Sequence, residues 1–186
     1  MKNSILAAAS KRFARYGFYK TTIEDIASDL NKVKSSLYYY FKTKEEIFKA
    51  VMEAELEEFA GALRESVEKE SSPKEKLRVF ICSHLKIFLK LMQGYCTLSE
   101  IYFSKHETVE DLRNVFDKRE IALVEKIIED GNKNKEFNAA EPRSCAYVIL
   151  TAIKGAEQQY FENKNSKNTL TLSKTLADIL VRGISR

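Results

Sequence analysis

The chain has 186 residues, of which 44% are hydrophobic and 31% charged, with only six glycines and two prolines. This composition is typical of a soluble globular protein with a sizeable core, and the shortage of glycine and proline favours long helices, so we predict an all-α fold. No stretch approaches the roughly 18 to 20 apolar residues of a membrane span, and Met1–Ser10 lacks the apolar run of a signal peptide. We therefore expect a cytoplasmic protein with no membrane partner.

The net charge of +4 is unevenly distributed along the chain. Residues 1–50 contain ten Lys and Arg against five Asp and Glu, a balance of +5, so the remaining residues sum to +4 minus +5, or −1. A basic N-terminal segment on a nearly neutral remainder indicates a polyanionic partner at one end of the molecule.

Apolar residues recur at helical spacing along the N-terminal segment. We expect a first helix over residues 3–16, ended by Gly17, and a second helix capped by Thr21 or Thr22. Asn31 is a suitable left-handed turn residue before a third, basic helix. Two short helices joined by a three-residue turn form a helix-turn-helix.

The same periodicity predicts further helices in the rest of the chain. They are expected over residues 43–70, 74–92, 97–105 and 109–134, then from Pro142 to a loop at 163–168, and over 170–184. With the first three, this gives about nine helices.

The segment Val33–Lys44 combines three lysines, two serines and three consecutive tyrosines with a few apolar residues. In a helix, Leu37 and Phe41 share the inner face and leave the hydroxyls, amines and rings exposed. Phosphate oxygens accept hydrogen bonds from Lys, Ser and Tyr, and short side chains on a helix reach base edges in the major groove of DNA. The segment therefore predicts a helix that binds double-stranded DNA.

Three blocks of residues follow one another in a single register over about the first fifty positions: Ile5-Leu6-x-x-Ala9-x-x-x-Phe13-x-x-x-Gly17, Thr21-Thr22-Ile23-x-x-Ile26-Ala27 and Leu37-Tyr38-Tyr39-Tyr40-Phe41-Lys42-Thr43-Lys44-Glu45-Glu46-Ile47. This pattern resembles the N-terminal domain of the TetR (tetracycline repressor) family of transcriptional regulators. The resemblance implies a helix-turn-helix DNA-binding domain over residues 1–46 and a helical regulatory domain, for ligand binding and dimerisation, over residues 47–186.

The turn before the third helix departs from the family pattern, because Asn31-Lys32-Val33 stands where Gly-Val-Ser or a similar sequence is usual. We expect Val33 to fill the apolar gap, with the stem of Lys32 lying along the surface. Since Val33 has no capping hydroxyl, the third helix is expected to be weakly capped.

Nine residues of the N-terminal segment are candidate DNA contacts. Four are expected to face base edges or nearby phosphates, namely Lys34, Ser35, Ser36 and Tyr39. The phosphate backbone is expected to contact Thr22, Tyr38, Tyr40 and Lys44, joined by Lys42. Because one short helix reads few base pairs, we expect a homodimer that places two such helices on a palindromic operator.

The resemblance implies that the last two long helices form the dimer interface as a four-helix bundle. Small or apolar residues on these helices are the candidates: Ala152, Gly155, Leu172, Leu176, Ile179 and Leu180. The alternative, that these residues only close the core of a single chain, stays open.

The resemblance also implies a small-molecule effector that releases the protein from DNA. Large apolar side chains and one carboxylate are candidate ligand contacts: Phe59, Phe88, Met92, Tyr95, Glu100, Tyr102, Phe103 and Phe116. Glu100 among aromatic residues would suit a cationic or aromatic effector. Each of these residues also fits an ordinary core position.

We therefore predict a sequence-specific transcriptional regulator, a repressor in the family's common mode, and no enzyme, cofactor or metal site. His84 and His106 are the only histidines, and no catalytic set or glycine-rich phosphate loop is present. The alternative is a helical DNA-binding regulator that is controlled by a protein partner or by thiol oxidation. The three cysteines that would serve the thiol version, Cys82, Cys96 and Cys145, are otherwise expected to be reduced core thiols.

Overall fold

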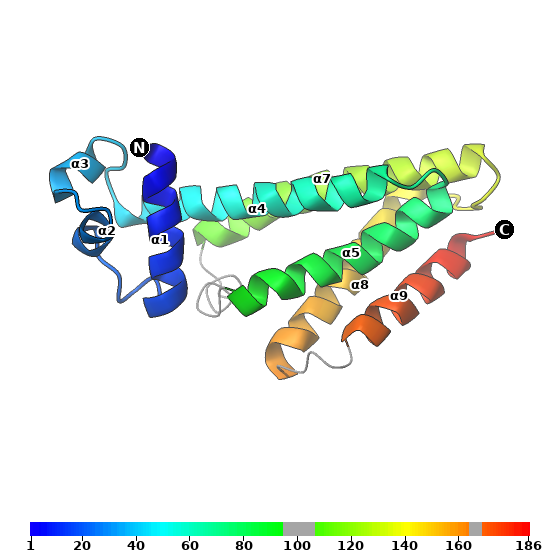
Figure 1. The fold of residues 1–186 in the computed structure, drawn as a ribbon. Coiled ribbons are helices and arrows are strands. Elements are labelled where there is room, and N and C mark those ends of the chain that lie inside the picture. The colour runs from blue at the N-terminus through cyan, green and yellow to red at the C-terminus, as the bar shows by residue number, and fades with distance from the viewer. Residues whose placement is uncertain (95–106, 164–168) are drawn as a thin grey trace. The chain divides into compact units, whose positions relative to one another are not determined.

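The computed structural model describes residues 1–94, 107–163 and 169–186. Regular secondary structure in these ranges is helical (Figure 1), apart from one isolated bridge between Phe137 and Ser185. The all-α prediction is confirmed, and the helix expected over residues 97–105 lies outside the described residues. The helices are α1 (Lys2–Tyr16), α2 (Ile23–Asp29), α3 (Lys34–Tyr38), α4 (Lys44–Glu68), α5 (Pro73–Gly94), α7 (Glu107–Lys133), α8 (Pro142–Asn163) and α9 (Thr169–Ile184).

The chain folds into two compact units. The first unit contains Met1–Glu58 with the described part of Leu91–Arg113, and the second contains Phe59–Lys90 with the described part of Asn114–Arg186. Helices α4, α5 and α7 therefore each contribute residues to both units. The domain boundary between residues 46 and 47 stays a prediction.

An apolar cluster holds the first unit together. Three phenylalanine rings lie at its centre, with ring centroids 5.7 Å apart for Phe13 and Phe48 and 4.7 Å apart for Phe18 and Phe48. Tilted and edge-on contacts of this kind stabilise aromatic pairs beyond the area they bury. The cluster also includes residues expected on the inner faces of the first three helices: Ile5, Ala9, Ile23, Ile26, Ala27, Leu37 and Phe41. Phe41 is buried as expected, but it lies after the end of α3 at Tyr38.

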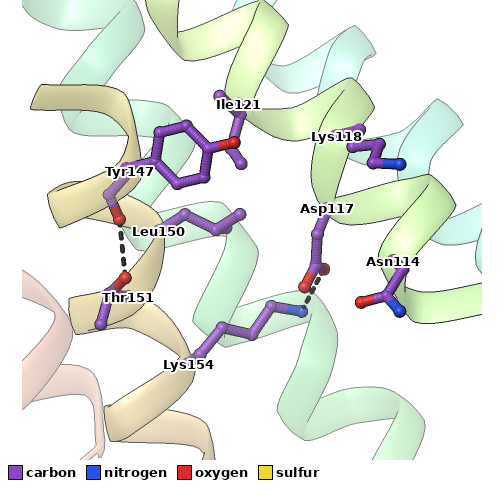
Figure 2. A pocket seen from close by; sticks show the side chains of 8 residues that line it. All are labelled: Asn114, Asp117, Lys118, Ile121, Tyr147, Leu150, Thr151 and Lys154. Atoms are coloured by element: carbon purple, nitrogen blue, oxygen red, sulfur yellow. Dashed lines mark hydrogen bonds and ion pairs between the residues drawn. The ribbon is translucent and has the colours of Figure 1, made fainter. Parts of the chain in front are cut away.

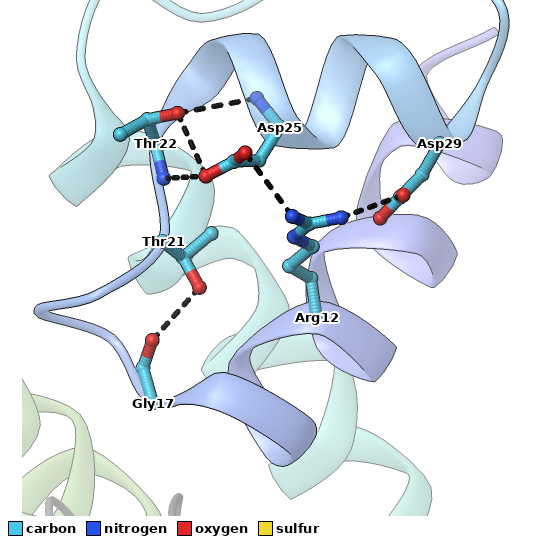
Figure 3. Close-up of polar contacts among 6 residues, drawn as sticks. All are labelled: Arg12, Gly17, Thr21, Thr22, Asp25 and Asp29. Atoms are coloured by element: carbon cyan, nitrogen blue, oxygen red, sulfur yellow. Dashed lines mark hydrogen bonds and ion pairs between the residues drawn. The ribbon is translucent and has the colours of Figure 1, made fainter.

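Local side-chain chemistry sets the ends of α1 and α2. Gly17 ends α1 with φ 85°, a left-handed conformation that favours glycine. Thr22 caps α2 by accepting a hydrogen bond from the backbone N–H of Asp25, and the Asp25 carboxylate accepts one from the Thr22 N–H (Figure 3). Thr21 instead donates its hydroxyl to the Gly17 carbonyl at 2.8 Å. Of the two expected caps, Thr22 is confirmed.

The turn between α2 and α3 agrees with the sequence in one respect and differs in another. Asn31 has φ 52°, as expected of a left-handed residue. Val33 precedes α3 without a side-chain capping bond, so the weak cap is also confirmed. The expectation that Val33 fills an apolar gap is wrong, because this side chain is 68% exposed. The core is already closed at this point by Ile26 and Leu37, which are fully buried.

The second unit packs α8 and α9 with the adjoining parts of α4, α5 and α7 (Figure 1). Its C-terminal residues are tied to the segment between α7 and α8. The Asn138 N–H donates to the Ile184 carbonyl at 2.8 Å, and the Arg186 N–H donates to the Glu136 carbonyl at 3.2 Å. Between these two contacts the ring of Phe137 is buried.

The buried ring of Phe137 lies directly against Gly131, where a Cβ would stand 2.1 Å from Phe137 Cδ2. We predict that Gly131→Ala lowers the free energy of unfolding by about 1 to 3 kcal/mol, because the ring must move within a filled core. Urea unfolding followed by circular dichroism measures the change. Gly61→Ala is the matched control, since Gly61 lies in α4 with no atom within 4 Å of the added methyl. The control should be neutral or stabilising by up to about 1 kcal/mol.

Candidate DNA-binding surface and buried charge cluster

The residues in and around α3 form a polar and aromatic surface over an apolar anchor. Leu37 and Phe41 are buried, at 0% and 5% exposure, whereas Tyr39 is 84% exposed. Most of the predicted DNA contacts are likewise exposed, namely Thr22, Lys34, Ser35, Tyr38, Tyr39, Tyr40 and Lys42; Ser36 and Lys44 are half-buried. The Tyr39 and Tyr40 rings pack edge to face with centroids 5.0 Å apart. Exposed rings beside amines and hydroxyls are poorly explained by folding alone.

Two of the lysines in this set are engaged by neighbouring groups of the same unit. Lys34 forms an ion pair with Glu24 of α2 and lies 5.4 Å from the centroid of the Tyr38 ring. The hydrogen bond with Glu24 raises the pKa of Lys34. Lys44 donates to the Phe18 carbonyl at 2.9 Å, with its ammonium 4.3 Å from the centroid of the same residue's ring. An ammonium carries three donors, so Lys44 retains two for a further acceptor.

Arg12 links α1 to α2, a role that the sequence did not predict. Its guanidinium lies 3.1 Å from an Asp25 carboxylate oxygen and 2.7 Å from one of Asp29 (Figure 3). Asp25 therefore serves both the capping box and this ion pair. Its pKa is lowered mainly by the hydrogen bonds from Thr22 and further by Arg12. Nothing in the helical periodicity distinguishes Arg12 from the other basic residues of α1.

A cluster of charged side chains lies inside the second unit. His84 of α5 is 1% exposed and lies between Glu120 of α7, at 7%, and Glu157 of α8, at 1%. His84 Nε2 is 3.1 Å from both carboxylate oxygens of Glu120. His84 Nδ1 is 3.2 Å from Glu157 Oε1, which is close enough for an ion pair. The two atoms are not aligned for a hydrogen bond. The rings of Phe59 and Phe80 pack against the imidazole at centroid distances of 4.9 and 5.7 Å.

The electrostatics of this cluster favour a charged imidazole. Burial by itself lowers the pKa of His84, but the nearby carboxylates of Glu120 and Glu157 outweigh this effect and raise the pKa to about 9. Burial by itself raises the pKa of Glu120, but the attraction to His84 outweighs this effect, so the pKa of Glu120 is lowered. Lys154 of α8 extends the cluster, with its Nζ 3.8 Å from Glu157 Oε2 and 2.9 Å from Asp117 Oδ1.

The burial of Glu120 and Glu157 could have been predicted from the sequence, because each lies at helical spacing from apolar residues. Glu120 follows Phe116 and precedes Val124 at four-residue spacing, which places its carboxylate on the buried stripe of α7. Glu157 continues the stripe of Ile153 on α8 in the same way. Within the described ranges no group of three or more His, Cys, Asp or Glu side chains is arranged to hold a metal ion.

Two protein-family models match the chain. Residues 5–51 match the family model described as "Bacterial regulatory proteins, tetR family". Residues 70–184 match the one described as "Tetracyclin repressor-like, C-terminal domain", which spans more than half of the chain. The chain belongs to the TetR family.

Full-length relatives have the same organisation. This TetR-family chain is 21% identical to the HTH-type transcriptional regulator QacR of Staphylococcus aureus over 188 aligned residues, which cover 100% of this chain and 99% of that protein. The crystal structure of a transcriptional regulator from Cytophaga hutchinsonii superposes with a TM-score of 0.81 at 27% identity and covers 98% of this chain and 97% of its own. The structure of Bacillus subtilis FadR in complex with stearoyl-CoA has a TM-score of 0.77 at 21% identity and covers 99% of this chain and all of its own, 100%.

Only some of the predicted ligand contacts lie in the part of the chain that the structure describes. Phe59, Phe88 and Phe116 are buried in the second unit. The Met92 side chain and all of Tyr95, Glu100, Tyr102 and Phe103 lie outside the part of the chain that the structure describes. The assignment of these residues to a ligand site stays a prediction.

The candidate dimer residues lie on α8 and α9 and include exposed apolar side chains. Ile179 is 63% exposed and Leu172 is 37% exposed, and on α8 the neighbouring Val148 is 61% exposed. Gly155 is exposed, with no atom within 4 Å of the position of a Cβ. Ala152, Leu176 and Leu180 are half-buried. The assignment of these residues to a dimer interface stays a prediction.

None of the helices in the described ranges combines the length and the hydropathy needed to cross a membrane.

The charge of buried His84 predicts a dependence of stability on pH. Its pKa of about 9 in the folded protein lies above the ordinary value of 6.5, so the stabilisation is fully present below pH 6.5 and is lost as the pH rises through 9. The loss is on the order of 3 kcal/mol. Urea unfolding at a series of pH values measures it, with the triple variant H84Q/E120Q/E157Q as the control, because neutral amides then replace the imidazole and both carboxylates that contact it. Equal slopes for the two proteins between about pH 6.5 and 9 would contradict the assignment.

Proposed function

We propose that this TetR-family protein is a sequence-specific DNA-binding repressor that a small-molecule effector releases from a palindromic operator. The observation that carries the proposal is the exposed surface of α3, where Lys34, Ser35 and Tyr39 lie over the buried anchor of Leu37 and Phe41. Membership of a family of DNA-binding transcription regulators supports the same conclusion.

The predicted DNA contacts in and around α3 divide into a sequence-reading set and a positioning set. Lys34, Ser35, Ser36 and Tyr39 would face base edges or adjacent phosphates. The remaining contacts, Thr22, Tyr38, Tyr40, Lys42 and Lys44, would bind the phosphate backbone on either side. The ion pair of Lys34 with Glu24 is largely exposed, so exchanging it for a phosphate or a base costs little.

A dimer follows from the size of α3. The helix spans five residues, Lys34–Tyr38, which is too few to select one site among many. Two copies on successive turns of a palindrome double the number of base pairs that are read. The apolar residues exposed on α8 and α9, Leu172 and Ile179 among them, are suited to a two-fold interface in which the same patch meets its copy.

Release by an effector requires that a ligand binds one of two conformations more tightly than the other. The second unit is the proposed site of this control. Its fold is shared with Bacillus subtilis FadR, which was solved in complex with stearoyl-CoA. Thiol oxidation at Cys82 is a weaker alternative, because burial raises the pKa of this thiol and so disfavours its reactive thiolate.

The division of DNA contacts is tested on an operator selected from random duplexes. Lys42→Ala should weaken binding to specific and non-specific DNA alike, and reduce the slope of log affinity against log salt by about 1, since one phosphate contact is lost. Ser35→Ala should instead change the preferred bases. Fluorescence anisotropy across a salt series measures both.

Lys69→Ala is the control, because Lys69 lies just after α4 in the second unit and pairs with Glu65. A selected sequence without two-fold symmetry would argue against the dimeric readout. A Lys42→Ala slope equal to that of the control would remove Lys42 from the phosphate contacts.

The proposed interface is tested by placing a charge on its most exposed apolar residue. Ile179→Glu should convert the dimer to a monomer at micromolar concentration and reduce operator affinity, because a buried unpaired carboxylate opposes association. Sedimentation velocity gives the oligomeric state, and circular dichroism shows that the helices persist. Val115→Glu on α7 is the control, since Val115 is 48% exposed and lies outside the candidate set. An unchanged dimer in the Ile179 variant would refute the interface.

A further inference from the structure

A pocket of about 520 Å³ opens between α7 and α8 in the second unit (Figure 2). This volume falls within the range of small-molecule sites, roughly 300 to 1,000 Å³. All of its lining residues belong to these two helices, and none is among the predicted aromatic ligand contacts.

One side of the pocket is apolar. Ile121 of α7 and Leu150 of α8 are buried, at 7% and 4% exposure. The ring of Tyr147, which is 48% exposed, stands beside Ile121 at the edge of the pocket (Figure 2). The Tyr147 ring supplies most of the apolar surface that water reaches here, and a hydrocarbon chain or an aromatic ring placed against it would cover that surface.

The other side of the pocket is polar and carries an excess of positive charge. Lys118 and Lys154 lie there with the single carboxylate of Asp117, so the lining has a net charge of +1. Asp117 is already bound by Lys154 at 2.9 Å (Figure 2). Lys118 is exposed and has no ion-pair partner among the described residues. The amide of Asn114 offers a further donor beside it.

This distribution of charge selects one class of ligand. A carboxylate would find Lys118 available and the amide of Asn114 nearby. A cation would have to displace Lys154 from Asp117 and would face two ammonium groups, which is unfavourable. The apolar wall opposite then accommodates the remainder of the molecule.

Lys154 connects the pocket to the interior of the unit. Its ammonium contacts Asp117 in the pocket and also lies 3.8 Å from Glu157 Oε2. The other oxygen of Glu157 contacts His84 at 3.2 Å. An anion in the pocket would compete with Glu157 for Lys154, and any movement of that side chain changes the charge balance around the buried imidazole.

We propose that the α7–α8 pocket binds a small monoanionic amphiphile, an organic carboxylate with an apolar or aromatic body, and that Lys154 couples its occupancy to the His84 cluster. The proposal rests on the proposed function, for which it supplies an effector site and an effector class. It differs from the cationic or aromatic effector that Glu100 suggested in both place and charge.

Binding is tested directly by calorimetry and ¹H–¹⁵N NMR, with decanoate as the probe and with decanol and decyltrimethylammonium as neutral and cationic counterparts. Decanoate should bind at least about tenfold more tightly than either counterpart and should shift the backbone amide signals of Asn114 and Thr151. Lys118→Ala should weaken decanoate about five- to tenfold. Lys126→Ala is the matched control, because Lys126 is an exposed lysine of the same helix outside the pocket.

Three results would overturn the site. They are no binding of decanoate, binding that Lys118→Ala leaves unchanged, and equal or tighter binding of decyltrimethylammonium. Operator affinity without any probe is measured separately. A protein that binds its operator but not decanoate overturns only this inference, whereas one that binds decanoate but no DNA overturns the proposed function and leaves the pocket in place.

The coupling has a readout of its own in the imidazole C2–H signal of His84. If decanoate draws Lys154 away from Glu157, the carboxylate is less compensated and the pKa of His84 rises. A titration with and without decanoate should therefore show an upward shift for the wild type. A Lys154→Met variant, which lacks the ammonium, should show no such shift. An unchanged His84 titration in decanoate-saturated wild-type protein would refute the coupling.

Discussion

The ion pairing of His84 with Glu120 and Glu157 is the constraint on which the second unit depends. Three helices, α5, α7 and α8, each contribute one member, and all three side chains are buried. Buried charges are costly unless each is paired, and removal of one partner leaves the others uncompensated. The cluster therefore stabilises only those arrangements that keep the three helices in register. It adds a requirement for charge pairing to the close packing of the surrounding apolar side chains.

The first unit places its charges differently. Arg12 pairs with Asp29 and Lys34 pairs with Glu24 at or near the surface, where water and salt weaken ion pairs, while the apolar cluster holds the unit together from inside. Charges held in this way exchange partners at little cost. The first unit thus has an apolar interior and ion pairs at its surface. The second unit has its ion pairs of His84 in the interior, where each charge needs a partner.

The sequence predicted the features that depend on local periodicity and turn chemistry. The positions of the helices in the described ranges, the Thr22 cap and the left-handed Asn31 follow from neighbours within a few residues of each other, and the structure confirms them. The prediction that Val33 is buried is wrong, because burial at this position depends on which other side chains already fill the core. The His84 cluster and the α7–α8 pocket join residues more than twenty positions apart, so their geometry exists only once the helices are packed.

The edge-to-face pair of Tyr39 and Tyr40 affects the entropy of binding. A tyrosine side chain has two rotatable torsions, fewer than the four of lysine, and these two rings already restrain each other. Ordering them against another surface therefore sacrifices less conformational freedom than ordering flexible side chains of similar reach. A surface built from tyrosine and serine is partly organised before any partner arrives.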